Sequence, residues 1–354
     1  MESTSVLWMI FLFISSFCFD PVTNLSNNKD DNLSRSKANH RSASIDERHF
    51  WKISDALSDI EYIHTILPHI LVERVSGTPQ HAVVKRFIVN RMKNLGWDVE
   101  ENEFFDRTPI DKVDRKFTNI IARLNPNAKR YLVLACHYDS KYQKGFVGAT
   151  DSAVPCAIIM NLAHALKPYL ETRKDTDLSL MFIFFDGEEA FKHWNAHDSI
   201  YGARHLAKKW HASDKLKHID MLVLLDLLGA PNPKFYNHFE NTTKWYYLLV
   251  DIESRLRASG GLVEHAHNSG TIKKRHEGMF QPFSLFNSGT EDDHIPFLRR
   301  QVPILHVIPT PFPQVWHEND DNIKNVNFDT VTDLNKIFGI FCLEYLRIDI
   351  GPFF

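Results

Sequence analysis

Short, predominantly apolar runs, each followed by a helical pattern, constrain the fold of this chain more than any other sequence feature. Four such runs cover residues 131–135 (YLVLA), 178–185 (LSLMFIFF), 219–225 and 303–308, and the first of them is apolar throughout. A strand that is apolar on both of its faces is typical of a sheet covered on both sides. Helical patterns occupy residues 51–67, 80–95, 153–166, 201–210, 242–258 and 329–346. Buried strands that alternate with helices predict an α/β fold with a largely parallel sheet.

The rest of the chain adds two strands and no domain boundary. Residues 97–105 and 117–124 alternate between apolar and polar side chains, which predicts a hairpin. No linker rich in Pro, Gly or Ser interrupts residues 47–354, so we expect one globular domain there. The content of 44% hydrophobic and 24% charged residues is that of an ordinary globular protein. The net charge of −3 gives no electrostatic footprint for binding nucleic acid.

The N-terminus predicts a secretory signal. Residues 7–19 form an almost unbroken apolar run, shorter than the roughly 20 residues that a membrane span needs. Ser15 and Ser16 place small side chains near a cleavage point, so we expect a signal peptide over residues 1–19. The expected product is secreted and has no membrane contact after signal removal. Retention in the Golgi by an uncleaved anchor is the alternative.

A polar leader follows the predicted signal. Residues 20–46 are rich in Asn, Ser, Asp and Lys and nearly lack apolar side chains, which predicts disorder. The triplets that begin at Asn24, Asn32 and Asn241 fit the acceptor pattern for N-glycosylation. These acceptor triplets agree with a secretory route.

The cysteines allow little covalent stabilisation. Four are present, and Cys18 leaves with the predicted signal. The remaining three permit at most one bridge within the chain, which would act as a local clamp. Cys156 lies at the start of a predicted apolar helix and Cys136 ends the neighbouring strand, so we expect these two to pair.

Polar side chains of the kinds that bind metals follow the predicted buried strands. In open α/β sheets, ligands bind beyond the carboxyl ends of the strands. Carboxylates and imidazoles at that edge are ligands that zinc prefers. The sequence therefore predicts a metal site formed from several strand ends. The side chains in question are His137, Asp151, Glu188, Glu189, Asp226 and His317.

The adjacent acids Glu188 and Glu189 are the sharpest local signal. Neighbouring side chains that leave a strand point in different directions, so one can bind a metal while the other faces the substrate. A catalytic zinc keeps one open position and works beside a base that is not a ligand. An acidic surface turn is the alternative. Ser152 lacks the surrounding pattern of a nucleophile elbow, so we do not expect a serine hydrolase.

Six sequence blocks resemble the animal glutaminyl cyclases (glutaminyl-peptide cyclotransferases). The resemblance extends from about residue 50 to the C-terminus. It implies the fold of the zinc aminopeptidases, a single domain with a central mixed sheet of six strands flanked by helices. The blocks are ACHYDSKY (135–142), ATDSAVPCA (149–157), FFDGEEAFKHW (184–194), LLDLLGAPNP (224–233), EDDHIPFLRR (291–300) and PFPQVWHENDDN (311–322).

The resemblance also implies a set of site residues. One zinc ion per chain is expected on Asp151, Glu189 and His317. Glu188 matches the general acid/base, and Asp226 and Asp292 match two further active-site carboxylates. Trp194, Phe312 and Trp316 match the aromatic walls of the substrate pocket, and Cys136 with Cys156 matches the family's disulfide. Glu291 departs from the Gln common in vertebrate members, which places an added negative charge at the pocket.

The implied reaction converts an N-terminal glutamine of a peptide or protein to pyroglutamate and releases ammonia, with N-terminal Glu left open as a second substrate. A monomer is expected. A two-zinc aminopeptidase is the main alternative, because His137 and Asp226, with Asp151 as a bridge, match the second metal position of that fold. A non-catalytic binding protein is a third interpretation, but it would be expected to have lost Glu188 or a ligand, and all are present.

Overall fold

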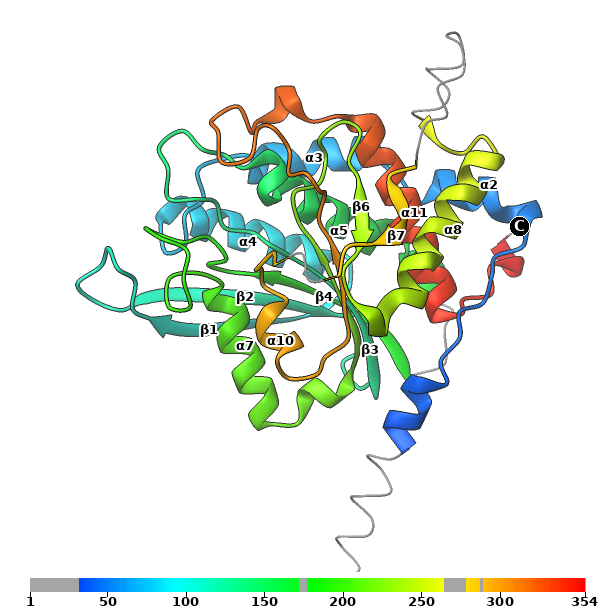
Figure 1. Ribbon diagram of the computed structural model, residues 1–354, viewed down its shortest axis with the longest axis horizontal. Coiled ribbons are helices and arrows are strands. Elements are labelled where there is room, and N and C mark those ends of the chain that lie inside the picture. The colour runs from blue at the N-terminus through cyan, green and yellow to red at the C-terminus, as the bar shows by residue number, and fades with distance from the viewer. Residues whose placement is uncertain (1–31, 172–176, 264–277, 287–288, 354) are drawn as a thin grey trace, which may run out of the picture. The chain divides into compact units, whose positions relative to one another are not determined.

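A computed structural model describes residues 32–171, 177–263, 278–286 and 289–353 (Figure 1). Two units are distinguished, Met1–His40 and Arg41–Phe354. In the first unit, residues 32–38 are helical. The predicted signal peptide of residues 1–19 lies outside the described residues. None of the described helices combines the length and the apolar character that a membrane crossing requires.

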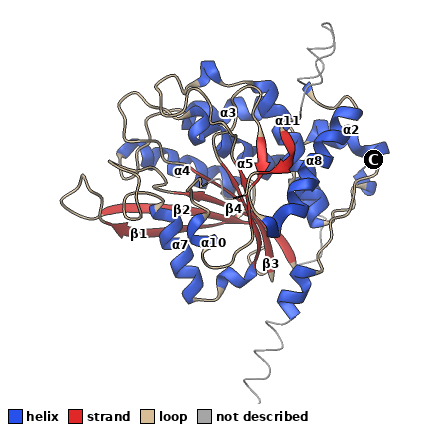
Figure 2. Ribbon diagram, in the orientation of Figure 1, coloured by secondary structure: helices blue, strands red, loops and turns tan. Residues whose placement is uncertain are grey.

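The second unit is built on a six-stranded sheet with the order β1-β2-β4-β3-β5-β8. The first two strands form the predicted hairpin, and β2 also runs antiparallel to β4, whereas β4, β3, β5 and β8 are parallel to one another. The predicted mixed, largely parallel sheet is therefore confirmed (Figure 2). The strands are β1 (Asp98–Asp106), β2 (Arg115–Arg123), β3 (Arg130–His137), β4 (Leu178–Phe185), β5 (Ile219–Leu225) and β8 (Ile304–Val307).

Helices cover both faces of this sheet, which explains why β3, β4 and β5 are buried at every position. Along β3, Leu132 and Leu134 pack into one apolar cluster, while Val133 and Ala135 pack into another, because successive side chains of a strand point to opposite faces. Figure 1 shows α7 and α10 on one side and α3, α4 and α5 on the other. The helices are α2 (Glu47–Ala56), α3 (Ile60–Ile70), α4 (Pro79–Asn94), α5 (Val154–Ala165), α6 (Lys167–Glu171), α7 (Tyr201–Ala212), α8 (Thr243–Ala258), α10 (Ile295–Leu298) and α11 (Phe328–Leu346).

The helix predicted over residues 51–67 is wrong in its extent, because two helices, α2 and α3, share that stretch. The Asp59 side chain accepts the Tyr62 N–H and so caps α3. The buried amide of Asn161 holds the break by donating to the Leu57 carbonyl and accepting the Asp59 N–H. A short parallel sheet of β6 (Phe235–Asn237) and β7 (Phe280–Ser284) was also not predicted.

The predicted disordered leader of residues 20–46 is wrong over its last part. Ala43 and Ile45 donate their N–H groups to the backbone carbonyl and the side-chain carboxylate of Glu344, respectively. The Ile45 side chain is buried in the main apolar cluster. One apolar residue and a buried acceptor on α11 are enough to order residues 41–46, which composition alone does not reveal.

Candidate active site

The carboxyl ends of β3, β4, β5 and β8 bring the sequence-predicted side chains to one edge of the sheet. His137 ends β3, and the turn after β4 carries Glu188 and Glu189. Asp226 follows β5, and the loop beyond β8 leads to His317. Asp151 reaches the same place from the segment before α5 and forms groups with four of these side chains.

Asp151, Glu189 and His317 form one candidate metal site. Their ligand atoms all lie within 4.8 Å of one another. The His317 Nε2 atom is 3.4 Å from Asp151 Oδ2 and 3.5 Å from Glu189 Oε1. Glu189 Oε1 is buried and accepts no hydrogen bond from any described residue. Two buried carboxylates that converge on an imidazole fit a divalent cation such as zinc.

His137, Asp151 and Asp226 form a second candidate metal site that shares Asp151 with the first. His137 Nε2 lies 3.0 Å from Asp151 Oδ1 and 3.4 Å from Asp226 Oδ1. The Ser152 hydroxyl donates a hydrogen bond to Asp226. The structure thus brings together both ligand sets that the sequence left open, the one-zinc set and the set for a second metal.

Asp139 holds the turn that carries the two acids. Its carboxylate accepts the backbone N–H groups of Gly187, Glu188 and Glu189, at 2.9, 3.1 and 3.2 Å. Gly187 has a φ of +71°, and a Cβ there would lie 2.6 Å from a ring carbon of Phe117. The turn therefore needs glycine at this position and an acceptor beneath it. Asp139 follows β3 directly but was not singled out, because one loop carboxylate is an ordinary feature.

Two further residues that sequence reasoning missed fix the Asp151 segment. The Asp321 carboxylate accepts the N–H groups of Thr150 and Asp151, at 2.8 and 3.2 Å. The guanidinium of Arg74, which is fully buried, donates to backbone carbonyls around that segment, including that of Gly148 at 3.0 Å. The buried charge of Arg74 also interacts with the carboxylates of Asp139, Asp151 and Asp321, and so offsets part of their mutual repulsion.

Glu188 has the electrostatics of a proton carrier. Burial raises the pKa of its carboxyl well above the usual range, and the charges of Asp292 and Glu189 raise it further against the opposing effect of His137. Among the described residues, no hydrogen bond joins the Glu188 side chain to Asp226 or Asp292, the two further active-site carboxylates that the family resemblance implies. The Glu188 side chain lines a cleft and is free to meet a ligand there.

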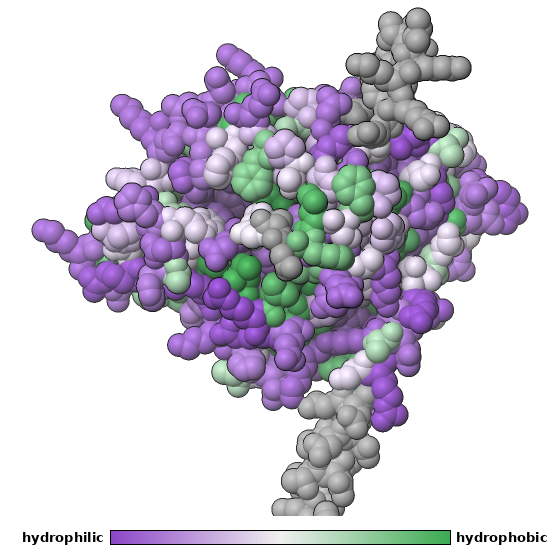
Figure 3. All heavy atoms as spheres, viewed as in Figure 1, coloured by the Kyte–Doolittle hydropathy of each residue, from purple (hydrophilic) through white to green (hydrophobic). Residues whose placement is uncertain are grey.

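The cleft above these residues has a volume of about 580 Å³ and includes all three predicted aromatic walls. The ring of Trp316 stacks on that of His317 with centroids 4.1 Å apart, and Phe312 meets Trp316 edge-on at 5.0 Å. Trp194 donates its indole N–H to Glu291 Oε2 at 3.0 Å. Figure 3 shows apolar side chains near the middle of the visible face, with hydrophilic ones around them.

Lys141 adds a positive charge to this cleft that the sequence did not predict. Its ammonium group lies 3.1 Å from Glu189 Oε2, the oxygen that does not face His317. Glu189 is thus oriented through one carboxylate oxygen and exposes the other toward the candidate metal site. No sequence signal distinguished this lysine from the other lysines of the chain.

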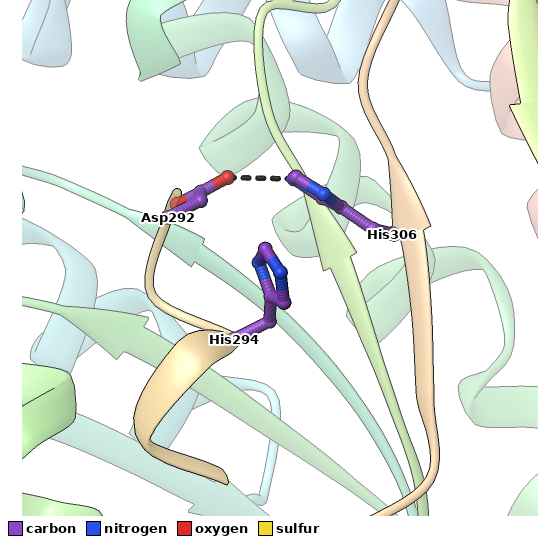
Figure 4. Close-up of side chains that lie close together, drawn as sticks. All are labelled: Asp292, His294 and His306. Atoms are coloured by element: carbon purple, nitrogen blue, oxygen red, sulfur yellow. Dashed lines mark hydrogen bonds and ion pairs between the residues drawn. The ribbon is translucent and has the colours of Figure 1, made fainter. Parts of the chain in front are cut away.

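Asp292 belongs to a buried network that includes histidines missed at the sequence level (Figure 4). Its Oδ2 atom lies 2.7 Å from His306 Nε2, and Figure 4 shows the two side chains pointing toward each other. The rings of His294 and His238 lie 4.3 and 5.9 Å from the ring of His306. Burial lowers the pKa of His306 to about 4. The ligand atoms of Asp292, His294 and His306 also lie close enough together to hold a metal ion. The hydrogen bond between Asp292 and His306 already explains why those two side chains meet.

We expect the buried histidine His238 to make the protein sensitive to mild acid. Burial and the nearby His306 lower its pKa from 6.5 to about 4. Between these two pKa values the unfolded state binds a proton at His238 and the folded state does not. The contribution of this residue to the free energy of unfolding is therefore fully present above pH 6.5 and falls as the pH drops toward 4. The loss from this residue is about 2–3 kcal/mol. His238→Phe should flatten the fall in Tm between pH 7.5 and pH 5, and an unchanged slope would contradict this account.

The structure describes both cysteines of the predicted bridge and two of the three predicted glycosylation acceptors. The sulfur atoms of Cys136 and Cys156 lie 3.1 Å apart, and both residues are buried free thiols, so the predicted bridge is not formed in the structure. Asn241 is exposed just before α8, and Asn32 is exposed in the first unit. Asn24 lies outside the described residues.

The family model described as Peptidase family M28 matches residues 119–341. A glutaminyl-peptide cyclotransferase from Drosophila melanogaster is 53% identical over 312 residues, which cover 88% of this chain and 87% of the relative. A glutaminyl-peptide cyclotransferase from Bos taurus is 43% identical, and the match covers 87% of this chain and 88% of the relative. The solved glutaminyl cyclase of Macrostomum lignano has 40% identity and a TM-score of 0.79, and the match covers 87% of this chain and 95% of that one.

A second solved structure extends the likeness at the level of fold alone. A Zn-dependent exopeptidase from Parabacteroides distasonis is 17% identical with a TM-score of 0.60, and the match covers 85% of this chain and 99% of that one. These solved proteins share the α/β fold of this chain. The chain belongs to peptidase family M28 and, within it, to the glutaminyl-peptide cyclotransferases.

Proposed function

We propose that this chain converts the N-terminal glutamine of peptides and proteins to pyroglutamate and releases ammonia. The observation that carries the proposal is the position of Glu188. It is a buried carboxyl with a raised pKa, next to a candidate metal ligand and open to a cleft with aromatic walls. The identity of 53% to a glutaminyl-peptide cyclotransferase supports the same reaction.

The reaction needs one proton carrier and no added reactant. The α-amine nitrogen of the substrate attacks the carbon of its own γ-amide, a C–N bond forms, and the bond to the amide nitrogen breaks. Glu188 accepts the proton that the amine loses and returns it to the departing nitrogen, which leaves as ammonia. The attack is intramolecular, so the site mainly has to fold the glutamine side chain back on itself.

One zinc ion would be held by Asp151, Glu189 and His317. When bound, zinc supplies a Lewis acid that polarises the carbonyl of the γ-amide. The donor set supports this assignment, since it combines two carboxylates and one imidazole and leaves room for substrate on the cleft side. Burial acts to lower the pKa of His317, but its contacts with Asp151 and Glu189 raise it to about 9, because the two carboxylates favour a positive charge at this position.

Asp226 and Asp292 would hold the substrate amine and tune Glu188. Both lie close enough to influence buried charges at the site, and Asp292 raises the pKa of Glu188. Burial and the charge of Asp226 raise the pKa of Asp292 itself well above its usual range. Carboxyl groups that lie this close together have coupled titrations. A proton can therefore pass between them over a short distance as the substrate binds.

The aromatic walls would select the shape of the substrate. Trp194, Phe312 and Trp316 enclose the cleft from separate loops, and flat apolar surfaces favour the compact, folded-back form of a glutamine side chain. Glu291, which accepts the Trp194 indole N–H, adds negative charge to the same rim. N-terminal Glu would be a poorer substrate, because its γ-carboxylate carries a negative charge into an acidic site.

The proposal also covers the cellular location, the glycosylation and the oligomeric state of the protein. The apolar run at residues 7–19 supports a signal peptide and secretion, with a retained Golgi anchor as the alternative. Exposed Asn32 and Asn241 are accessible to glycosylation, and Asn24 shares their sequence pattern. We expect the protein to act as a monomer.

Secretion would also allow Cys136 and Cys156 to form a disulfide. Their sulfur atoms already face each other at 3.1 Å between the end of β3 and the start of α5. A bridge that closes a loop of this size stabilises a protein by about 2–4 kcal/mol. Protein purified from a secretory host should therefore show one free thiol, that of Cys342, after denaturation without reductant. Three free thiols would contradict the bridge.

The proposed function is tested by the products formed from a peptide with N-terminal glutamine. The purified protein should release ammonia, and mass spectrometry should find a peptide that has lost one ammonia and kept every residue. A two-zinc aminopeptidase would instead release free glutamine and a peptide shortened by one residue. That result, without any pyroglutamate, would contradict the proposal.

A further inference from the structure

A second cleft adjoins the reactive one and is markedly basic. It has a volume of about 290 Å³ and lies between α7 and the segment around α10. Arg204 and Lys208 enter it from α7, four residues apart and therefore on one face of the helix. Arg299 and Arg300 enter it from the end of α10. We call this cleft, with these four cations, the basic groove.

Little in the described structure neutralises the basic groove. Glu291 is the one acid on its wall. Lys208 and Arg299 are exposed, and neither forms an ion pair with a described acidic side chain. Arg300 donates to the backbone carbonyl of Pro296, which does not cancel its charge. Arg204 donates to backbone carbonyls and lies 3.8 Å from Asp106, so it is partly paired.

The basic groove continues the reactive cleft. Glu291 lines both. Trp194 lines the reactive cleft, and the next two residues along the chain, Asn195 and Ala196, line the basic groove. The Trp194 indole donates a hydrogen bond of 3.0 Å to Glu291, which both clefts share, and we call this pair of side chains the ridge. A peptide whose N-terminal glutamine fills the reactive cleft can therefore lay its following residues across this ridge.

We propose that the basic groove binds acidic side chains of the substrate peptide downstream of its N-terminal glutamine. The inference rests on the proposed function, because it takes the occupant to be the rest of the same substrate. Charge complementarity and the shared Glu291 wall select this occupant. The ridge and the groove act in opposite senses: Glu291 disfavours an acidic residue that lies beside it, and the four cations favour one that lies beyond it.

The test uses a series of otherwise neutral peptides with N-terminal glutamine, in which a single Glu is moved from position 2 to position 6. At low ionic strength, a Glu placed in the groove should lower KM by about three- to tenfold relative to the neutral peptide, with kcat unchanged. The gain should shrink at high salt. A Glu at position 2 should bring no gain, and Glu291→Gln should improve that peptide selectively.

The double variant Lys208→Ala/Arg299→Ala should remove the gain and leave kinetics with the neutral peptide unchanged. Lys209→Ala is the matched control, since Lys209 is an exposed neighbour on the same helix that does not line the groove. Equal KM values across the series, or a gain that survives in the double variant, would overturn the inference. If the neutral peptide itself yields no pyroglutamate, the proposed function fails instead, so the two failures are distinct.

Discussion

Replacing Glu188 by glutamine is expected to lower kcat for pyroglutamate formation by about 10²–10⁴-fold. Glutamine keeps the size of the side chain and its hydrogen-bonding ability but cannot accept the proton of the substrate amine. The backbone of residue 188 stays fixed, because Asp139 holds it through the N–H and not through the side chain. Zinc content should remain that of the unchanged protein, because Glu188 is outside both metal clusters that include Asp151.

Glu240→Gln provides a control for this prediction, since it makes the same chemical change at an exposed position that lines neither the reactive cleft nor the basic groove. Its kcat should equal that of the unchanged protein. Turnover by Glu188→Gln at a normal rate would remove Glu188 from the mechanism. A loss of zinc together with activity would show that the residue acts through the metal and not on the proton.

Replacing His317 by alanine is the second change with a large expected effect. The variant should lose both its zinc after dialysis and its activity, because Asp151 and Glu189 would be left as two ligands without the imidazole. The measurement is zinc per folded chain by elemental analysis, together with ammonia release. A variant that keeps its zinc and its turnover would remove His317 from the ligand set.

His137→Gln is the matched variant in the neighbouring cluster. His137 contacts Asp151 and Asp226 but belongs only to the second candidate site. On the one-zinc account the variant keeps one zinc per chain. Some loss of thermal stability is expected, because Asp139, Asp151 and Asp226 lose a buried partner. Burial acts to lower the pKa of His137, but hydrogen bonds with these three carboxylates raise it well above its usual value. Loss of half of a two-zinc content, together with activity, would favour a two-metal peptidase.

The parts of the fold that the sequence predicted are those in which local pattern and burial agree. The bounds of β4 and β5 match the predominantly apolar runs 178–185 and 219–225, because each run begins and ends with apolar side chains that the sheet buries. The acids that follow these strands were found for a related reason. Asp226 is the first residue after β5, and Glu188 and Glu189 lie within four residues of the end of β4, where the chain leaves the edge of the sheet.

The features that were missed depend on contacts between distant parts of the chain. Asn161 breaks the first predicted helix from about a hundred residues away, and nothing near residue 59 except the capping Asp59 signals it. Ile45 is ordered by Glu344 at the other end of the chain. His306 was taken as one more position of a buried strand, and only its contact with Asp292 gives it a role. Periodicity carries no information about such partners.

The metal count was left to the family resemblance, and the structure shows why spacing could not decide it. Asp151 stands in both clusters, with Oδ2 toward His317 and Oδ1 toward His137. Both sets of side chains therefore lie close enough together to bind a cation. What distinguishes them is the cleft: Glu189 and His317 line it, whereas His137 is almost fully buried behind them.

Titration of the metal-free protein with zinc tests the central claim most directly. Chelator-treated protein is mixed with increasing zinc, and the initial rate of ammonia release from a peptide with N-terminal glutamine is measured at each ratio. A one-zinc site predicts that the rate rises linearly and reaches its plateau at one zinc per chain. A plateau only at two zinc ions per chain, or full activity without any metal, would contradict the account.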